Sequence, residues 1–175
     1  VLLQQGHVQE ALTHYQEGLK IRQKLADADP KDGRAQRDLS IAHDKLGDVL
    51  LQQGQVQQAL THYQDGLKSK QKRADADPKD AQAQRDLSIS HERLGNVLLQ
   101  QGQVQQALKH YQEGLKIREK RAAADPSNFQ AQTGLFISCF KLGMTTQQIG
   151  EPGKAAAWFQ KALEILLPLE EAGKL

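Results

Sequence analysis

Histidine is the residue type in this chain that most readily suggests catalysis or metal binding, because imidazole exchanges protons near neutral pH and coordinates transition metals. His62 stands three residues before Asp65, and His110 three before Glu113, which is the spacing of an acid–base dyad on a helix. These dyads are copied along the chain, whereas an active site is normally singular. Copies on neighbouring repeats lie roughly 8–10 Å apart per packed helix, too far for one zinc ion with bonds of about 2.1 Å. We therefore predict structural histidines and no metal site. The recurring histidines are His14, His62 and His110 at one position and His43 and His91 at another.

Two further patterns could carry chemistry. Cys139, the single cysteine, stands one period after His91 and could pair with it as a nucleophile, but no third group is present to orient them. The run from Gly150 to Ala155 resembles a phosphate-binding loop, yet Gln148 replaces its first glycine and Ala155 its metal-binding hydroxyl. We interpret Cys139 as a core residue and the glycine run as a turn. The chain is therefore predicted not to be an enzyme and to use no cofactor.

Composition places the chain among soluble globular proteins, with 175 residues, 38% of them hydrophobic and 25% charged. A net charge of +2 is too small to produce the long-range electrostatic field expected of a nucleic-acid-binding protein. No run of about 18 apolar residues is present to span a bilayer. We therefore expect neither nucleic acid nor a membrane as a partner. Because the chain begins at Val1 without Met or a signal-like segment, we expect a piece of a longer protein. The start of the chain does not decide its compartment, and we expect the cytoplasm.

The chain is built from an internal repeat. Val-Leu-Leu-Gln-Gln-Gly begins at Val1, Val49 and Val97, a period of 48 residues, and the first two copies differ at only 12 positions. A degenerate fourth copy begins at Thr145, as is typical of the end of an array. We predict one solenoid over 1–175, with copies at 1–48, 49–96, 97–144 and 145–175.

Each copy reads as two helices, because apolar residues recur at spacings of three and four in two successive segments. We call them helix A, seen at 39–51 across the boundary between the first two copies, and helix B, seen at 56–67 of the second. No segment alternates as a strand would. A truncated helix A is predicted at Val1–Gln5. Seven complete helices are predicted at 7–28, 32–53, 55–76, 80–101, 103–124, 128–148 and 152–171.

The helix ends have their own signals. Gly54 suits the left-handed position that ends helix A, since glycine carries no Cβ. Asp77-Pro78 ends helix B, because proline disfavours helical geometry in the residue before it. Side chains able to cap the next helix A follow in each copy, namely Asp32, Asp80 and Asn128.

This spacing resembles the tetratricopeptide repeat, whose motif is W-x2-L-G-x2-Y, then A-x3-F, then P. Over residues 1–165 the resemblance implies an all-α solenoid of helical hairpins wound into a right-handed superhelix. The period of 48 exceeds the family's period of about 34. About seven extra residues per helix, nearly two turns, would lengthen each helix without turning its packing face. The matching residues are Leu46, Gly47, Ala59 and Tyr63, then Leu94, Gly95, Ala107 and Tyr111, then Leu142, Gly143, Ala155 and Phe159, while His43, His91 and Cys139 replace the opening aromatic.

Relatives with this repeat commonly receive a peptide or a partner helix on the concave wall formed by their A helices, so the resemblance implies a protein-interaction scaffold. Some relatives clamp a C-terminal carboxylate with Lys and Asn, but Asp44, Glu92 and Phe140 stand at the Lys position here, so that ligand class is not expected. The predicted partner-binding residues are Arg37, Ile41, Asp44, Lys45, Asp48, Arg85, Ile89, Glu92, Arg93, Asn96, Phe136, Ile137, Phe140, Lys141 and Met144.

Other functions remain open at this point. Near-identical copies also fit a structural spacer, or a self-associating or sensor segment of a larger signalling protein. An RNA reader similar to the pentatricopeptide family is not expected, because base-reading side chains would vary between copies. Basic runs at the ends of the B helices are interpreted as a solvated face that offsets the helix dipole.

The last copies exchange polar residues for apolar ones. On helix A, Phe136, Phe140 and Met144 replace polar residues at spacings of four, and we predict an apolar anchor for a partner there. The alternative is that another segment of the same chain covers this stripe. On the last helix B, apolar residues appear where a terminal repeat should be polar, so something should cover them. A further repeat or the segment after Pro168 folding back could do so, and we favour end-to-end self-association. The residues predicted for it are Trp158, Leu166, Leu167 and Leu169.

Overall fold

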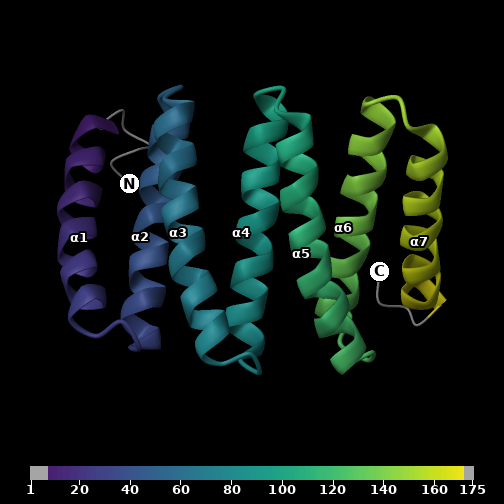
Figure 1. Ribbon diagram of the computed structural model, residues 1–175, viewed down its shortest axis with the longest axis horizontal. Helices are drawn as coiled ribbons and strands as arrows, with labels where there is room; N and C mark the ends of the chain where they lie inside the picture. The colour runs from purple at the N-terminus through teal and green to yellow at the C-terminus, as the bar shows by residue number, and fades with distance from the viewer. Residues whose placement is uncertain (1–7, 172–175) are drawn as a thin grey trace. The chain divides into compact units, whose positions relative to one another are not determined.

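The computed structural model describes residues 8–171, which form seven helices and no strand (Figure 1). Every complete helix was expected from the sequence, and each observed boundary lies within one residue of its predicted position. The short helix predicted at Val1–Gln5 lies outside the described residues. The helices are α1 (Val8–Ala28), α2 (Gly33–Gln52), α3 (Val56–Ala76), α4 (Ala81–Gln100), α5 (Val104–Ala124), α6 (Phe129–Gln148) and α7 (Pro152–Glu171).

The predicted end signals explain these boundaries. The Asp32 carboxylate accepts hydrogen bonds from the backbone N–H groups of Arg34 and Ala35, which satisfies two donors at the start of α2. Asp80 caps α4 in the same way, and the side-chain oxygen of Asn128 accepts from the Ala131 N–H in α6. Gly54, Gly102 and Gly150 end the three A helices with φ of 73°, 72° and 77°.

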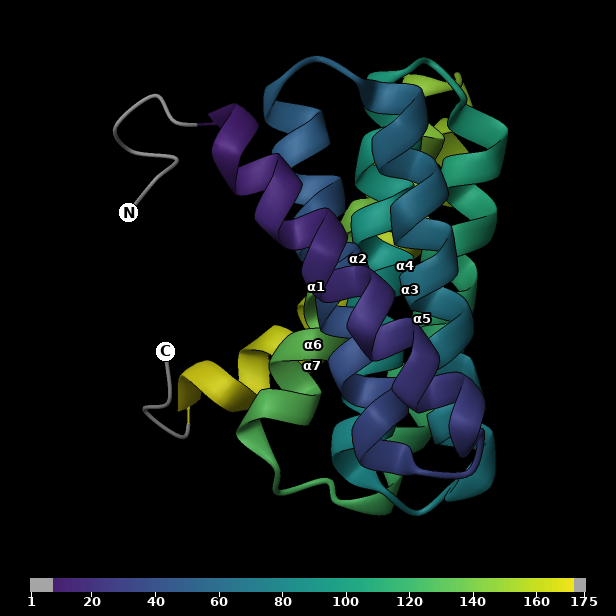
Figure 2. The same ribbon diagram turned by 90° about the vertical axis from the view of Figure 1, so that its left-hand side faces the viewer.

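The chain forms two compact units, Val1–Ser90 and His91–Leu175. In the first, α2 packs against both α1 and α3, and Figure 2 shows α1 lying in front of α2. In the second, α6 packs against both α5 and α7. The A helices are α2, α4 and α6, and the B helices are α1, α3, α5 and α7. The boundary between the units falls inside α4 and within the second copy, so the copy boundaries remain a prediction.

The core of each hairpin is a layer of small and branched apolar side chains between helices A and B. One leucine of each A helix is fully buried, and Cys139 is buried as expected of a core residue. Small residues on the B helices, such as Ala59 and Ala107, are also fully buried. This alternation of large and small side chains lets long helices approach closely. The buried leucines of the A helices are Leu46, Leu94 and Leu142.

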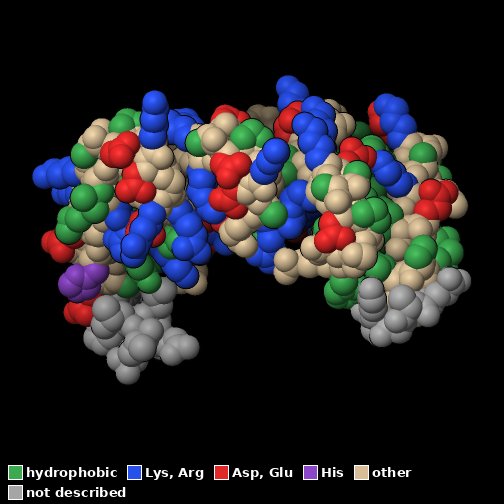
Figure 3. Space-filling model, turned by 90° about the horizontal axis from the view of Figure 1, so that it is seen from below, with side chains coloured by type: hydrophobic (Ala, Val, Ile, Leu, Met, Phe, Trp, Pro, Cys, Tyr) green, Lys and Arg blue, Asp and Glu red, His purple; other side chains and the backbone are tan. Residues whose placement is uncertain are grey.

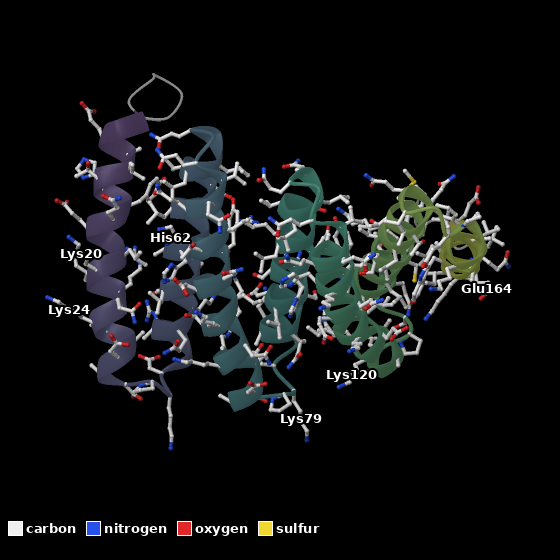
Figure 4. All side chains as sticks on the ribbon, turned by 45° about the horizontal axis from the view of Figure 1, so that its top comes forward. Lys20, Lys24, His62, Lys79, Lys120 and Glu164 are labelled. Carbon is white, nitrogen blue, oxygen red and sulfur yellow. The ribbon has the colours of Figure 1, made fainter. Side chains whose placement is uncertain are left out.

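Leu94→Ala should lower the free energy of unfolding by roughly 2–5 kcal/mol, because the truncated side chain leaves a cavity that its neighbours fill only in part. Urea unfolding followed by circular dichroism measures the change. Lys120→Ala, at an exposed position of α5 labelled in Figure 4, is the control and should change stability by less than about 0.5 kcal/mol. A cost below about 1 kcal/mol for Leu94→Ala would contradict its place in the core.

Candidate functional site

Every A helix presents a glycine to an aromatic ring of the following B helix. A Cβ atom added at Gly47 would lie 2.6 Å from Cε1 of Tyr63, and one added at Gly143 would lie 2.6 Å from Cε1 of Phe159. Gly95 meets the Tyr111 ring in the same way. Any other residue would collide with the ring, so glycine fixes how closely the two helices approach.

Beside this contact, the histidines of the two helices meet. The Nδ1 atoms of His43 and His62 are 3.1 Å apart, and those of His91 and His110 are also 3.1 Å apart. In each pair one Nδ1–H donates to the other Nδ1. The sequence analysis did not predict these pairs, because it compared each histidine only with its equivalent one period away. The shared spacing of 19 residues between a helix A histidine and a helix B histidine is the signal that could have revealed them. Within residues 8–171, no group of three or more potential ligands is placed to hold a metal ion.

Burial controls the charge of these rings. Desolvation lowers the pKa of His43 and His62, and the nearby Asp65 carboxylate opposes that shift. In the second pair, burial and the neighbouring His110 lower the pKa of His91 to about 4, with Glu113 opposing. Burial also lowers the pKa of His110. All four imidazoles are therefore neutral at physiological pH, which suits hydrogen-bonded structural pairs.

An ion pair bridges the same two helices through the acid that directly follows each helix A histidine. Lys70 Nζ donates to Asp44 Oδ2 at 2.7 Å, and Arg118 Nη2 donates to Glu92 Oε2 at 2.5 Å. Both cations are buried, although their positions lie in the basic runs expected to form a solvated face. Burial raises the pKa of Glu92, but hydrogen bonds and charges from Arg118 and Lys141 hold it below its usual value. Asp44 and Glu92 are therefore bound to cations within their own hairpins, which makes them less available to a partner.

A third polar pair involves the residue that directly follows the helix A glycine, Gly47 or Gly95. The Tyr63 hydroxyl donates to Asp48 Oδ1 at 2.8 Å, and the Tyr111 hydroxyl donates to Asn96 Oδ1 at the same distance. Lys141 Nζ also donates to Asn96 Oδ1 at 2.8 Å, which links α6 to α4 within the second unit. Burial, with a smaller contribution from Glu92, raises the pKa of Tyr111 to about 12. The Tyr111 hydroxyl therefore keeps its proton at neutral pH and can donate it in the hydrogen bond to Asn96.

In the last hairpin all three polar pairs are apolar. Cys139 and Trp158 take the places of the histidines, Phe140 and Leu166 those of the ion pair, and Met144 and Phe159 those of Asn96 and Tyr111. The ring centroids of Phe140 and Phe159 lie 5.6 Å apart, and those of Phe136 and Phe140 lie 6.0 Å apart. Phe140 thus packs within its own hairpin as well as facing outward.

Comparison with known proteins agrees with this architecture. Three family models described as tetratricopeptide repeat match the chain, at residues 1–30, 38–120 and 137–165. The chain belongs to the tetratricopeptide repeat family. With no strand among the described residues, its fold is an all-α helical repeat solenoid, and such repeats generally mediate protein–protein interaction.

Solved structures give the same fold. The crystal structure of BtubC (BKLC) from P. vanneervenii aligns with a TM-score of 0.63 and 18% sequence identity. The alignment covers 93% of this chain but only 58% of that one. A search of curated proteins found no match. No helix in the described part of the chain is long and apolar enough to cross a membrane.

The residues predicted to bind a partner on these tetratricopeptide repeats fall into two groups. Those that point most to solvent are Arg37, Ile41, Lys45, Ile89, Phe140 and Met144, and the last two have 45% and 51% of their surface exposed. The others are half-buried: Asp44, Asp48, Arg85, Glu92, Arg93, Asn96, Phe136, Ile137 and Lys141. The exposed surface of the A helices is therefore narrower and less acidic than the sequence suggested.

The residues predicted for self-association are exposed only in part. Leu169 is only 8% exposed, so little of its side chain is available to another molecule. Trp158 and Leu166 are half-buried, and Lys161 lies over the Trp158 ring. Of the four predicted residues, Leu167 alone is exposed.

The basic runs on the B helices are largely paired. Lys68 and Lys116 form ion pairs of 2.8 and 2.7 Å with acids three residues earlier, and Arg73 binds both Asp80 and Asp86. Figure 3 shows Lys and Arg side chains interspersed with Asp and Glu on the face seen there. Lys24, Lys72 and Lys120 are exposed.

Stability should fall as the pH drops from about 6.5 towards about 4, because histidine pKa values lowered by folding make protons bind preferentially to the unfolded chain. Thermal unfolding across this range measures the effect, with Tm falling about 2–4 °C for each kcal/mol lost. The double variant His91→Gln, His110→Gln should show a shallower pH slope, while carboxylates act mainly below pH 4. Equal slopes for both proteins would contradict the structural role of the pair.

The exchange of the ion pair for Phe140 and Leu166 can be tested by reversing it. Phe140→Glu alone should lower the free energy of unfolding by about 1–3 kcal/mol, because a carboxylate would face apolar rings without a partner. Adding Leu166→Arg should recover part of this loss, giving a coupling of about 1 kcal/mol or more in a double-mutant cycle. Additive effects of the two substitutions would show that the positions do not meet.

Proposed function

We propose that this tetratricopeptide repeat array is a non-catalytic scaffold that binds a peptide or partner helix along its A helices, on the face that relatives use as a concave wall. One observation carries the proposal: large apolar side chains remain exposed on the A helices, most of all Phe140 and Met144. Exposed apolar side chains gathered on one kind of helix are typical of an interaction surface.

The chemistry of this face favours a partner with both apolar and acidic residues. On α2, Ile41 is exposed between Arg37 and Lys45, each one helical turn away. The neighbouring acids Asp44 and Asp48 are half-buried and accept hydrogen bonds from Lys70 and Tyr63. A peptide with an apolar side chain between carboxylates would complement the pattern.

Self-association is the second candidate, because Leu163 and Leu167 are exposed one turn apart on α7. Such a contact would join copies through an end of the array and could propagate. It would make the chain a structural spacer or sensor segment of a larger protein, with the A helices free for other uses.

The binding proposal predicts that Met144→Glu weakens a peptide selected from a random display library at least tenfold without changing Tm. Met144 is the better target, since Phe140 also packs inside its hairpin. Gln112→Glu, the same charge change at an exposed position of α5, is the matched control and should leave affinity unchanged. Fluorescence anisotropy measures both.

Two results would count against this function. Equal affinity of Met144→Glu and the parent protein would move the site away from α6. Light scattering that shows a mass rising with concentration, abolished by Leu167→Glu, would favour self-association instead.

A further inference from the structure

The turn from α3 into α4, which Lys79 marks in Figure 4, is closed by an arginine that bridges two acids. Arg73 Nη2 donates to Asp80 Oδ2 at 2.8 Å, and its Nη1 donates to Asp86 Oδ2 at 3.0 Å. Among the described residues, Asp80 and Asp86 form ion pairs with Arg73 alone. The cation of this bridge therefore comes from the B helix that leads into the turn.

The turn from α1 into α2 keeps both acids but not the arginine. One period earlier, Asp32 and Asp38 stand at the positions of Asp80 and Asp86, whereas Leu25 stands at the position of the arginine. A leucine side chain has no hydrogen-bond donor. In the described part of the chain, neither Asp32 nor Asp38 forms an ion pair. The two acceptors of the bridge are therefore present without their donor.

The carboxylate of Asp32 is already held in the orientation that the bridge needs. Its Oδ1 accepts hydrogen bonds from two backbone N–H groups at the start of α2, at 2.8 and 3.2 Å. Asp80 Oδ1 accepts two equivalent bonds at the start of α4, both at 2.9 Å, which leaves Oδ2 to Arg73. Because Asp32 is exposed and Asp38 is half-buried, solvent reaches both.

A buried acceptor at the same end of the hairpin also lacks a donor. Gln36 is 2% exposed, and its Nε2 donates at 3.3 Å to the carbonyl of Ala26, the residue after Leu25. Its buried Oε1 accepts no hydrogen bond from a described residue. The equivalent Gln84 donates to Ala74 in the same way and is not left with such an oxygen. The turn without the arginine is thus the one whose polar groups are incompletely satisfied.

We propose that Asp32 and Asp38 bind the guanidinium group of an arginine supplied by a partner protein. One terminal nitrogen donates to Asp32 Oδ2 and the other to Asp38, as Arg73 donates to its two acids in the next hairpin. A guanidinium suits this pair because its donors form a rigid planar fork, whereas a lysine ammonium is a point charge. A calcium ion would need about six or more oxygen ligands. The proposal does not rest on the A-helix face proposed above, so either can fail alone.

Arg34 is the cation of α2 best placed to compete, since it stands one turn before Asp38. It is exposed and forms no ion pair with that acid. Its position is that of Gln82, whose Nε2 donates to the other oxygen of Asp86, Oδ1, at 2.6 Å. An Arg34 side chain turned toward Asp38 in this way leaves Oδ2 available to a partner.

Acetylarginine amide is a suitable probe, titrated into the full chain and followed through the backbone amide signals of an isotope-labelled sample. The signals of Asp32 and Asp38 should shift saturably, and Asp38→Asn should weaken binding about tenfold because a charge-assisted bond is lost. Acetylcitrulline amide, in which a neutral urea replaces the guanidinium, should not bind. Asp27→Asn, which removes an exposed carboxylate at the end of α1, is the matched control and should leave affinity unchanged.

A second experiment supplies the guanidinium from within the chain. Leu25→Arg should raise Tm by about 2–4 °C and abolish binding of the probe, because its own side chain then fills the site. Leu25→Gln removes the leucine without adding a guanidinium and should do neither.

Three results would overturn the proposal. They are absence of saturable binding, equal affinity for acetyllysine amide, and unchanged probe binding by Leu25→Arg. A dimer of the parent chain that Asp38→Asn dissociates would also overturn it, because a second copy would then supply the cation.

Discussion

The contact between a glycine of helix A and an aromatic ring of helix B is the constraint on which the rest of each hairpin depends. It is retained at Gly47, Gly95 and Gly143, although their neighbours change from polar to apolar. Because the ring lies where a Cβ would be, the helices approach closely enough for imidazoles to meet at 3.1 Å and for short ion pairs to form. Polar side chains in two hairpins and apolar side chains in the last one therefore fill the same space between helices A and B.

Most of the fold could be predicted from the sequence, because helix ends and helix faces are set locally. Asp32 and Asn128 cap their helices and Gly54 takes the left-handed conformation, all for reasons contained within a few residues. The candidate site was less predictable. Helical periodicity places Asp44 and Glu92 on a face of helix A, but only the register between helices shows that Lys70 and Arg118 reach them.

The same limit explains the other differences. Leu169 has the spacing of an exposed face but is only 8% exposed, because helical spacing alone does not decide which side of α7 is covered. The apolar residues Phe140 and Leu166 suggested two separate contact sites when considered singly. Considered as a pair, they occupy the places of an acid and a base that face each other in the preceding hairpin. Spacings shared between copies, 19 residues for the histidines and 26 for the ion pair, are the signal that could have shown this.

The ion pair also restricts the order in which such a repeat can evolve. Replacing the acid first would leave a cation like Arg118, whose side chain is 7% exposed, without its carboxylate. Breaking a buried pair in this way costs about 3–5 kcal/mol. Replacing the cation first leaves Glu92 with 23% exposure and a second partner, Lys141, at 3.0 Å. The milder intermediate is the second one. The hairpin that holds Glu92 therefore tolerates loss of its cation better than loss of its acid.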